Sequence, residues 1–397
     1  MKVLLLGVGL QGKVALHDLV NSDSISEIIA ADKEINTLKQ LVKHNQYSKV
    51  RCEFLDANNQ DHINQLMSLK PDIVIDLLPI PFLERIAISA VKFGLNLINT
   101  LSVTPQIRAL EGEAKRKGIT VLPEFGLDPG IDLVLLGQAI KGLEDIEVIN
   151  SYGAGIPTLE AANNPLKYKV TWSFEGVLHT YFRKSRIIRN GEIVTIKENE
   201  IFNSENIHEI NIEDIGTLEA FPNGDALQYL QSIGIEEKSK KFKSIKQMGR
   251  YTMRWPGHCS FWKKVVDLHL LDNEQIEIDG TKINRRTFLA KILAPHLQLE
   301  ANERDLAILH IEVVGKKQGK KTRIIYQLVD KRDLKTGFTA MSRTVGYTVS
   351  IGAQMVGNGQ ITKKGILSPV NDVQFDIFER ELNKRGIIIK SKIEPVL

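Results

Sequence analysis

The sequence has few of the features that mark secreted, metal-bound or membrane proteins. Its 397 residues include only two cysteines, Cys52 and Cys259, which provide neither a disulfide framework nor a cysteine zinc cluster. The net charge of +4 comes from 52 basic and 48 acidic side chains, and this small excess predicts no nucleic-acid partner. The first apolar run is broken at Gly7, too early for a signal peptide or a membrane span. We therefore expect a globular cytoplasmic protein with no metal centre and no membrane partner.

What the first third of the sequence does contain is a regular alternation of apolar runs and helical patterns. Helical spacing of apolar residues occurs over 13–19, 60–69, 82–92 and 105–117. Between and around these stretches lie six short apolar runs, at 3–6, 28–31, 50–55, 73–78, 95–98 and 119–122. Six strands that alternate with helices predict an α/β fold with a Rossmann-type, doubly wound parallel sheet.

The pattern changes after about Gly130, where longer alternating segments begin. Strands are expected at 170–173, 194–196, 308–314 and 326–328, with a polar turn over 189–192. Helical patterns at 346–356 and 373–385 are expected to return to the first sheet. We therefore predict a dinucleotide-binding domain over residues 1–124, completed by about 345–397. Residues 125–344 should form an α+β substrate-binding and dimerisation domain with a mixed sheet.

The first 32 residues contain a complete dinucleotide-binding motif, in which a glycine-rich turn joins a strand to a helix. Gly7 permits the tight turn, Gly9 lets the backbone approach a pyrophosphate, and Gly12 lets the helix pack closely on the strand. The amides around Leu10 and Gln11 should then face the pyrophosphate. A glycine turn alone is a weak signal, but here it follows an apolar strand and opens a helical pattern.

The acidic residue at the end of the second strand favours NAD over NADP. Asp32 can accept hydrogen bonds from the adenosine ribose hydroxyls, and its charge would repel the extra phosphate of NADP. Lys33 beside it could attract that phosphate, so NADP stays possible. Asp56 is a candidate adenine-side contact, with a helix N-cap as the alternative. Leu78 and Pro79, which end the fourth strand, should lie along the path of the cofactor.

Three later clusters carry polar and aromatic groups that could bind a substrate. Residues 124–132 follow the sixth strand at the carboxyl edge of the sheet, where such folds bind ligands, although Asp128 or Asp132 could simply cap the next helix. Residues 163–173 contain amides, lysines and aromatics that could line a substrate site. The alternative is a surface turn followed by an edge strand. In the third cluster, over 254–258, Arg254 could clamp a carboxylate or stack on Trp255 at the surface.

These clusters resemble the saccharopine dehydrogenase family, which also includes lysine 6-dehydrogenases. The resemblance runs from the first strand to about Pro369 and is carried by motifs in the family's order and spacing: Gly126-Leu-Asp-Pro-Gly-Ile-Asp132, Asn164-Pro-Leu-x-Tyr-Lys-x-x-Trp-Ser173, Gly191, Phe221-Pro-Asn223 and Arg254-x-x-Gly257. It implies a nicotinamide-dependent oxidation of a carbon that bears nitrogen, in lysine metabolism.

The resemblance also implies roles for individual residues. Asp128 matches the family's proposed acid/base carboxylate, and Arg254 resembles its carboxylate anchor. His258 is a further proton-transfer candidate without a secure family counterpart. The residues that resemble the lining of the substrate site are Tyr168, Lys169, Trp172, Ser173 and Asn223.

Two positions depart from the family pattern. Saccharopine enzymes tend to have arginine where this chain has Gly224, which removes a partner for one of the three carboxylates of saccharopine. A neighbouring cation, such as Lys167 or Arg250, would restore that partner. The family also tends to have a lysine just before the fifth strand, where this chain has Gly94. Acid/base duty then falls on Asp128 alone, or on Lys92 if the register slips.

Three functions compete. The first is saccharopine dehydrogenase, which forms or cleaves a secondary amine bearing glutamate. The amino-acid sequence of residues 163–169 favours it. L-Lysine 6-dehydrogenase oxidises the same carbon but acts on a substrate with one carboxylate, so Gly224 would be no loss. A nucleotide-binding sensor that has lost catalysis would explain both departures. We expect a homodimer, because proteins with such folds commonly form symmetric dimers.

Overall fold

The computed structural model describes residues 1–237 and 239–396 of the chain. Contacts divide it into two compact units, each of which is discontinuous in sequence. The first unit comprises Met1–Gly137 and Ser342–Ile387, and the second comprises residues 138–341 with the segment from Ile388 onward. No helix in the described ranges is long and apolar enough to cross a membrane.

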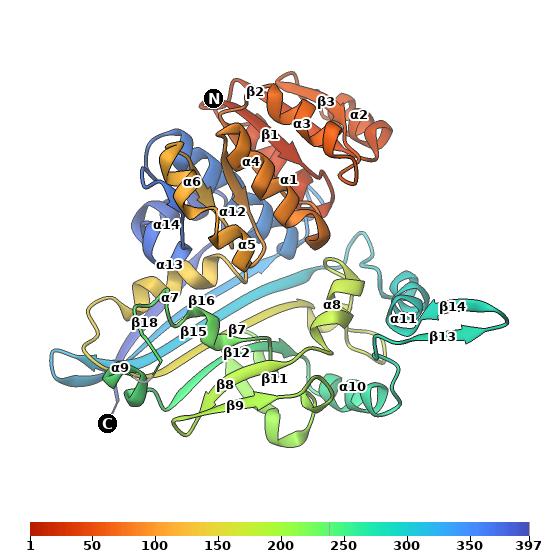
Figure 1. Cartoon of the computed structure of the whole chain (residues 1–397). Coiled ribbons are helices and arrows are strands. Elements are labelled where there is room, and N and C mark those ends of the chain that lie inside the picture. The colour runs from red at the N-terminus through yellow and green to blue at the C-terminus, as the bar shows by residue number, and fades with distance from the viewer. Residues whose placement is uncertain (238, 397) are drawn as a thin grey trace. The chain divides into compact units, whose positions relative to one another are not determined.

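The first unit is built on a parallel seven-stranded sheet with the order β17-β6-β5-β4-β1-β2-β3. Strands β1, β2 and β3 of this sheet are labelled in Figure 1. The predicted Rossmann-type sheet is confirmed, because the strand order reverses direction at β1 and every pairing is parallel. Its strands are β1 (Lys2–Leu6), β2 (Glu27–Asp32), β3 (Val50–Phe54), β4 (Ile73–Asp76), β5 (Asn96–Asn99), β6 (Thr120–Leu122) and β17 (Gly365–Ile366).

Helices cover both faces of this sheet. On one face, apolar residues of α3, α4 and α6 pack on Leu4, Ile29 and Val74. On the other, Gly346 of α12 lies against the backbone of α1, where a Cβ would come within 2.6 Å of the Gln11 carbonyl. The helices are α1 (Leu10–Val20), α2 (Ile35–His44), α3 (Gln60–Ser68), α4 (Leu83–Phe93), α5 (Pro105–Arg108), α6 (Glu111–Arg116), α7 (Ile131–Ile140), α12 (Ala340–Gly357), α13 (Pro369–Asp372) and α14 (Phe375–Lys384).

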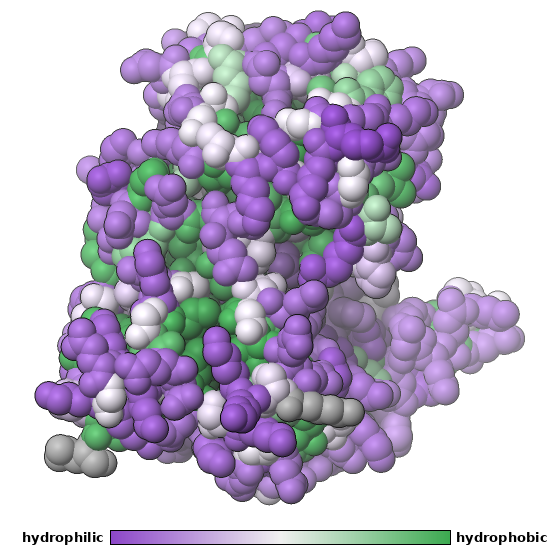
Figure 2. Space-filling model, turned by 60° about the vertical axis from the view of Figure 1, so that its left-hand side comes forward, coloured by the Kyte–Doolittle hydropathy of each residue, from purple (hydrophilic) through white to green (hydrophobic). Residues whose placement is uncertain are grey.

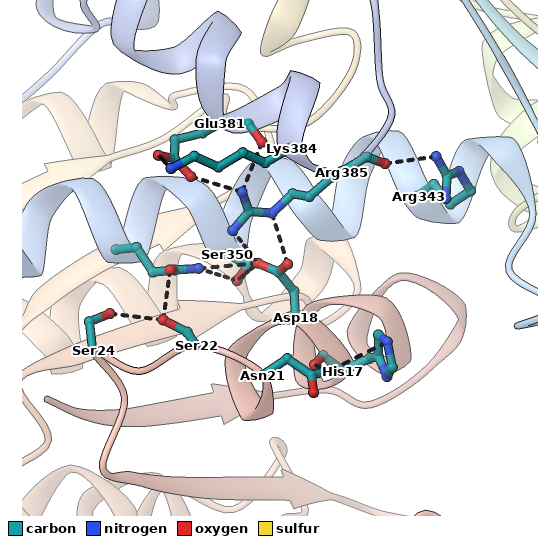
Figure 3. A network of polar contacts seen from close by, with 11 residues as sticks. His17, Asp18, Asn21, Ser22, Ser24, Arg343, Ser350, Glu381, Lys384 and Arg385 are labelled. Atoms are coloured by element: carbon teal, nitrogen blue, oxygen red, sulfur yellow. Dashed lines mark hydrogen bonds and ion pairs between the residues drawn. The ribbon is translucent and has the colours of Figure 1, made fainter.

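A polar network ties the returning C-terminal helices to the first helix of this unit (Figure 3). The Asp18 carboxylate on α1 accepts hydrogen bonds from Arg385 Nε and Nη2, both over 2.8 Å. Ser350 Oγ and Gln354 Nε2, both on α12, donate to the same carboxylate over 2.6 and 3.1 Å. Arg385 Nη1 also donates to a Glu381 carboxylate oxygen over 2.9 Å. One largely buried carboxylate therefore joins three helices that are far apart in sequence.

The second unit contains a nine-stranded mixed sheet whose main path has the order β10-β11-β12-β7-β15-β16-β18. β7 pairs in parallel with β12 and antiparallel with β15. The strands are β7 (Ile146–Pro157), β8 (Ser185–Arg189), β9 (Glu192–Ile196), β10 (His208–Ile212), β11 (Gly216–Pro222), β12 (Gln247–Arg254), β15 (Asp305–Lys317), β16 (Lys320–Lys331) and β18 (Ile389–Pro395), with a separate hairpin of β13 (Gln275–Ile278) and β14 (Thr281–Asn284).

Short helices of the second unit enclose an aromatic core beside this sheet. Tyr181 lies at its centre, with ring centroids 5.0 Å from Trp262 and 5.6 Å from Phe221. The surface of the chain is largely hydrophilic in the view of Figure 2, with apolar side chains between the polar ones. The helices are α8 (Phe174–Thr180), α9 (Lys240–Ser244), α10 (His258–Asp267) and α11 (Arg285–Leu293).

Two segments differ from the prediction. The expected strand at 170–173 is irregular, because Val170 N donates to the Leu297 carbonyl and Ser173 already caps α8. The end of the chain does not complete the first sheet: β18 pairs with β16 of the second sheet, with Ile389 opposite Leu328. Only the segment up to Ile387 belongs to the dinucleotide-binding unit.

Candidate active site

The glycine-rich turn after β1 has the geometry of a pyrophosphate cradle. Gly7 has a φ of +86°, and a Cβ at Gly12 would lie 2.1 Å from the Gly7 carbonyl oxygen. By contrast, a Cβ at Gly9 would meet nothing within 4 Å, so the protein leaves open space there. Helix α1 begins at Leu10 without a side-chain cap, which leaves the amides of Leu10 and Gln11 for an anion. These residues fit a bound dinucleotide.

Asp32 braces the glycine turn from the end of β2. Its Oδ2 accepts from Val8 N over 2.7 Å, and its Oδ1 accepts from Glu34 N over 2.9 Å. Each carboxylate oxygen keeps a second lone pair, so the ribose hydroxyls can still donate to Asp32. Lys33 beside it is exposed. Asp32 therefore also stabilises the turn through Val8 N and Glu34 N, a role that its position in the motif does not reveal.

Asp56 follows β3 and closes a local turn. Its Oδ1 accepts from the Asn58 backbone N and from Asn58 Nδ2, both over 3.0 Å. These bonds, together with the nearby Lys33, hold the pKa of Asp56 below its ordinary value. The helix-cap alternative for Asp56 is wrong, because Asn59 is the N-cap of α3. An adenine-side contact stays a prediction.

Asp76 and Asn99 lie side by side at the carboxyl ends of β4 and β5, and the sequence analysis missed both. Each side chain is buried and accepts a hydrogen bond from the backbone amide two residues later in the chain. Asp76 Oδ1 accepts from Leu78 N, and Asn99 Oδ1 accepts from Leu101 N. Asp76 Oδ2 has no hydrogen-bond partner among the described residues. Burial raises the pKa of Asp76 to about 7. A charged residue that ends an apolar strand next to β1 was the signal available.

Leu78 and Pro79 continue from this strand end. Leu78 is partly buried against the apolar core, and its side chain also lies 3.3 Å from the position that a Gly7 Cβ would take. Pro79 is exposed and begins a short 3-10 turn over Ile80–Phe82. Leu78 therefore lies beside the glycine turn, and a contact of Leu78 or Pro79 with the cofactor stays a prediction.

The Asp128 loop follows β6 and turns sharply before α7. Gly130 has a φ of +150°, and a Cβ there would come within 2.1 Å of the Gly126 carbonyl oxygen. Asp132 Oδ1 accepts from Gly130 N over 2.7 Å, so Asp132 stabilises the turn. Asp128 is half-buried and precedes a cis peptide bond to Pro129. The two carboxylates of this motif thus differ in burial, and Asp132 is the one that stabilises the turn.

Arg254 ends β12 in the second unit, where it is 4% exposed. Its Nε donates to the Tyr181 hydroxyl over 2.9 Å and its Nη1 donates to the Met253 carbonyl over 2.9 Å. The guanidinium carbon lies 5.2 Å from the centre of the Tyr168 ring. No carboxylate of the described residues forms an ion pair with Arg254. The surface stack on Trp255 is therefore wrong, and the site holds a desolvated cation.

His258 positions Tyr181 and does not fit a proton-transfer role. The imidazole is 2% exposed, with Nδ1 3.0 Å from the Leu166 carbonyl oxygen and Nε2 2.8 Å from the Tyr181 hydroxyl. The carbonyl can only accept, so Nδ1 carries the proton and Nε2 accepts from Tyr181. Burial, and then the charge of Arg254, lowers the pKa of His258 to about 3. A base this weak stays neutral near pH 7.

The cluster over 163–173 contributes unequally. Tyr168 is buried and faces Arg254, but Lys169 forms an ion pair with Glu303 over 3.0 Å. Ser173 is exposed and accepts from Gly176 N as the cap of α8. The Trp172 ring lies 2.7 Å from where a Gly176 Cβ would be. Tyr168 is thus the one of these four that contacts the Arg254 guanidinium in the described structure.

Asn223 follows β11 beside Gly224. Its backbone N donates to the Arg250 carbonyl over 2.8 Å, and its Oδ1 accepts a short hydrogen bond from Arg183 Nη2. A Cβ at Gly224 would lie 3.0 Å from Arg183 Nη2 and 3.1 Å from its Cζ. Lys167, by contrast, donates to the Pro256 carbonyl. The guanidinium in contact with Gly224 is therefore that of Arg183, which the sequence analysis did not name.

Two family models match almost the whole chain. The saccharopine dehydrogenase NADP binding domain matches residues 3–122, and the saccharopine dehydrogenase C-terminal domain matches residues 126–387. The chain belongs to the saccharopine dehydrogenase family. It is a saccharopine dehydrogenase-like oxidoreductase that uses NAD(P) and acts on a small amino-acid substrate.

Relatives of known name agree with this family. The chain is 26% identical to saccharopine dehydrogenase [NADP(+), L-glutamate-forming] from Pyricularia oryzae, over 98% of each protein. It is 25% identical to the mitochondrial alpha-aminoadipic semialdehyde synthase of Bos taurus, of which it spans 47%. The structure of apo saccharopine dehydrogenase (L-Glu forming) from Saccharomyces cerevisiae superposes with a TM-score of 0.85 at 25% identity, covering 99% of both chains.

Lys92 does not replace the lysine expected of a saccharopine dehydrogenase. It lies in the last turn of α4 and is exposed, and Gly94 ends that helix with a φ of +70°. Both residues precede β5, so they lie at the amino edge of a parallel sheet. The glycine turn after β1 is at the opposite, carboxyl edge. An acid/base role for Lys92 is therefore wrong.

Proposed function

We propose that this chain oxidises saccharopine with NAD(P)⁺ and releases glutamate and aminoadipate semialdehyde, or runs the reverse reaction. The observation that carries the proposal is the buried Arg254 guanidinium, which has no carboxylate partner among the described residues. Burying a cation without a counterion is costly, so such a group is best explained by an anionic ligand. A substrate carboxylate supplies that anion and can bind the guanidinium in a bidentate manner.

The chemistry places three demands on the protein. The secondary amine loses a proton, the lysine-side carbon that bears the nitrogen loses a hydride, and water then adds to the resulting imine before the C–N bond breaks. The dinucleotide accepts the hydride when it is bound. We assign the proton transfers to Asp128, which accepts the amine proton and later returns one to the departing nitrogen of glutamate. Arg254 binds a carboxylate, and Tyr168 and Tyr181 hold its guanidinium.

We further propose that NAD is the better cofactor, although the Pyricularia oryzae relative is named for NADP. The support is the Asp32 carboxylate at the end of β2, whose charge opposes a phosphate on the ribose. Lys33 is exposed beside it and is the residue that would admit NADP.

The test is turnover of the purified chain with saccharopine and, separately, with L-lysine, followed by the absorbance of reduced nicotinamide. Saccharopine turnover with glutamate as a product supports the proposal. Ammonia release from lysine, without saccharopine turnover, would replace it with a lysine 6-dehydrogenase. Binding of dinucleotide without turnover of either substrate would leave the sensor function.

A homodimer in the cytoplasm also stays a proposal. The support for a dimer is the edge strand β18, in which Ile393 is 58% exposed, and Ile388 just before the strand is 55% exposed. The support for the compartment is that both cysteines are free. Light scattering of the full chain would measure the mass, and a monomer at micromolar concentration would exclude the dimer.

A further inference from the structure

Arg183 is a second mostly buried guanidinium without an acidic partner. It lies between α8 and β8, and no carboxylate within residues 1–237 and 239–396 forms an ion pair with it. Nη2 donates to Asn223 Oδ1, and Nε has no hydrogen-bond partner among the described residues. Burial lowers the pKa of the Arg183 guanidinium. Most of its five N–H donors therefore make no hydrogen bond within the part of the chain that the structure describes.

The local backbone holds this guanidinium against Gly224. Gly224 N donates to Ser185 Oγ over 3.0 Å, and Arg186 N donates to the Gly224 carbonyl over 3.2 Å. Asp225 is already neutralised by Arg186 Nε and Nη2. The carboxylate that follows Gly224 in sequence is thus occupied by another arginine. The missing side chain at Gly224 gives Arg183 its place, since a Cβ there would lie 3.0 Å from Nη2.

Arg183 and Arg254 belong to opposite ends of one strand pair. Asn223, which holds Arg183, is opposite Arg250 on β12, and Arg254 ends the same strand. Four residues separate these positions, or about 13 Å of strand at about 3.3 Å per residue. By strand alternation, Arg250, Arg254 and Asn223 share one face of the sheet. Two guanidinium groups, Arg183 and Arg250, therefore lie near one end and one lies near the other.

This distribution of charge matches saccharopine, which carries two carboxylates on its glutamate part and one on its lysine part. We propose that Arg183 binds a carboxylate of the glutamate part, in place of an arginine at position 224, while Arg254 binds the carboxylate of the lysine part. The inference rests on the proposed function and makes it more specific. L-Lysine, with its single carboxylate, would not need Arg183.

The experiment measures the reverse reaction, in which glutamate and aminoadipate semialdehyde are separate substrates. Arg183→Ala should raise the KM for glutamate about 10- to 100-fold, the scale of a lost charged hydrogen bond, and leave the KM for the semialdehyde within about twofold. Arg254→Ala should show the opposite pattern. An unchanged KM for glutamate in a folded Arg183→Ala variant would overturn the inference.

Three further variants guard against a structural explanation. Arg183→Gln keeps a donor for Asn223 but removes the charge, so it should fold normally and show the same KM defect. Gly224→Arg in the Arg183→Ala background should recover part of the glutamate affinity, because it returns a guanidinium to the site. Arg323→Ala, which removes a surface arginine paired with Glu312 and Glu394, should change neither KM. A glutamate defect in Arg323→Ala would count against the inference.

Calorimetry separates this inference from the proposed function. Glutamate is titrated into the wild type and into Arg183→Gln, each saturated with NAD(P)⁺. If the wild type binds glutamate through Arg183 but does not turn over saccharopine, the proposed function fails and the glutamate site stands. If the wild type turns over saccharopine and both proteins bind glutamate equally, the function stands and the role of Arg183 is refuted. If the wild type neither binds glutamate nor turns over saccharopine, both are refuted.

Discussion

The Arg254 guanidinium donates a hydrogen bond from Nε to the hydroxyl of Tyr181, over 2.9 Å. That hydroxyl in turn donates to Nε2 of a neutral His258, whose Nδ1 is held by the Leu166 carbonyl. The chain of donors runs in one direction, from the cation to a backbone carbonyl. A substrate carboxylate would meet a guanidinium whose orientation is already fixed, which lowers the entropic cost of binding.

Loss of this guanidinium should weaken substrate binding. We expect Arg254→Ala to raise the KM for saccharopine about 10- to 100-fold, because one charged hydrogen-bonded contact is lost. Tyr181→Phe should also raise the KM for saccharopine, but by less. The guanidinium remains, and only the hydrogen bond that orients it is lost. Steady-state kinetics with Arg323→Ala as the control measures both. A normal KM in Arg254→Ala would remove Arg254 from the substrate site.

Protonation of His258 should destabilise the protein in acid. The unfolded imidazole titrates near 6.5, whereas the folded pKa is about 3, so the unfolded state binds the additional proton between these values. His258 therefore contributes full stability above about pH 6.5 and loses it progressively as the pH falls toward 3. Urea unfolding of His258→Gln at about pH 7 and about pH 4 should show a smaller acid loss than the wild type. Equal losses would contradict the neutral buried imidazole.

The glycine turn allows cofactor binding to be separated from folding. Gly9→Ala adds a methyl that meets no protein atom, so the melting temperature should hold while the Kd for NAD(P)⁺ rises about 10-fold or more. Gly12→Ala should also destabilise the fold by about 1 to 3 kcal/mol, because its Cβ would overlap the Gly7 carbonyl. Gly112→Ala on α6, another open position, serves as the control. Full cofactor affinity in Gly9→Ala would place the pyrophosphate elsewhere.

Asp32 should set the preference between the two dinucleotides. Asp32→Ala removes an acceptor for the ribose hydroxyls and the charge that repels a ribose phosphate. We expect kcat/KM for NAD⁺ to fall about 10-fold and the ratio of NADP⁺ to NAD⁺ to rise, measured with saccharopine at saturation. Asp61→Ala, an exposed change on α3, should leave both values intact. A fall that is equal for the two cofactors would mean that Asp32 acts only as a brace for Val8 and Glu34.

The Asp18 network should be a stability element without a catalytic duty. Asp18→Ala leaves the mostly buried Arg385 guanidinium without its main partner, so unfolding in urea should show a loss of about 3 kcal/mol. Lys384→Ala, which removes an exposed partner of Glu381, should cost about 0.5 kcal/mol or less. The KM values for both substrates should be unchanged in Asp18→Ala at a temperature where it is folded.

The sequence predicts the cofactor unit well because its signals are local. Gly7, Gly9 and Gly12 lie within one turn, and the apolar strands of this sheet are continuous because both of its faces are buried. β7 was missed because Ile146–Pro157 mixes polar residues with two glycines and has weak alternation. The segment that forms β18 was placed in the first domain, because strand pairing between distant segments leaves no local pattern.

The proposed substrate residues also divide into those with a local sequence motif and those that only the fold brings together. Arg254 and Asp128 occur in recognisable motifs, whereas Tyr181 and Arg183 have no motif of their own. Tyr181 is 73 residues from Arg254 in sequence, and Arg183 is 40 residues from Asn223. Only the folded sheet brings these groups together, so the role that Gly224 leaves to Arg183 could not be found from spacing.

The chain crosses from one unit to the other and back before it ends, and this constrains its synthesis. The first unit needs residues up to Ile387, and the second unit needs β18 beyond it. Neither unit has all of its segments until the ribosome has added Ile387, so we expect both to be completed late in synthesis. An early stop after Ile387 would spare the dinucleotide unit yet leave β16 as an open edge, a place for chains to aggregate.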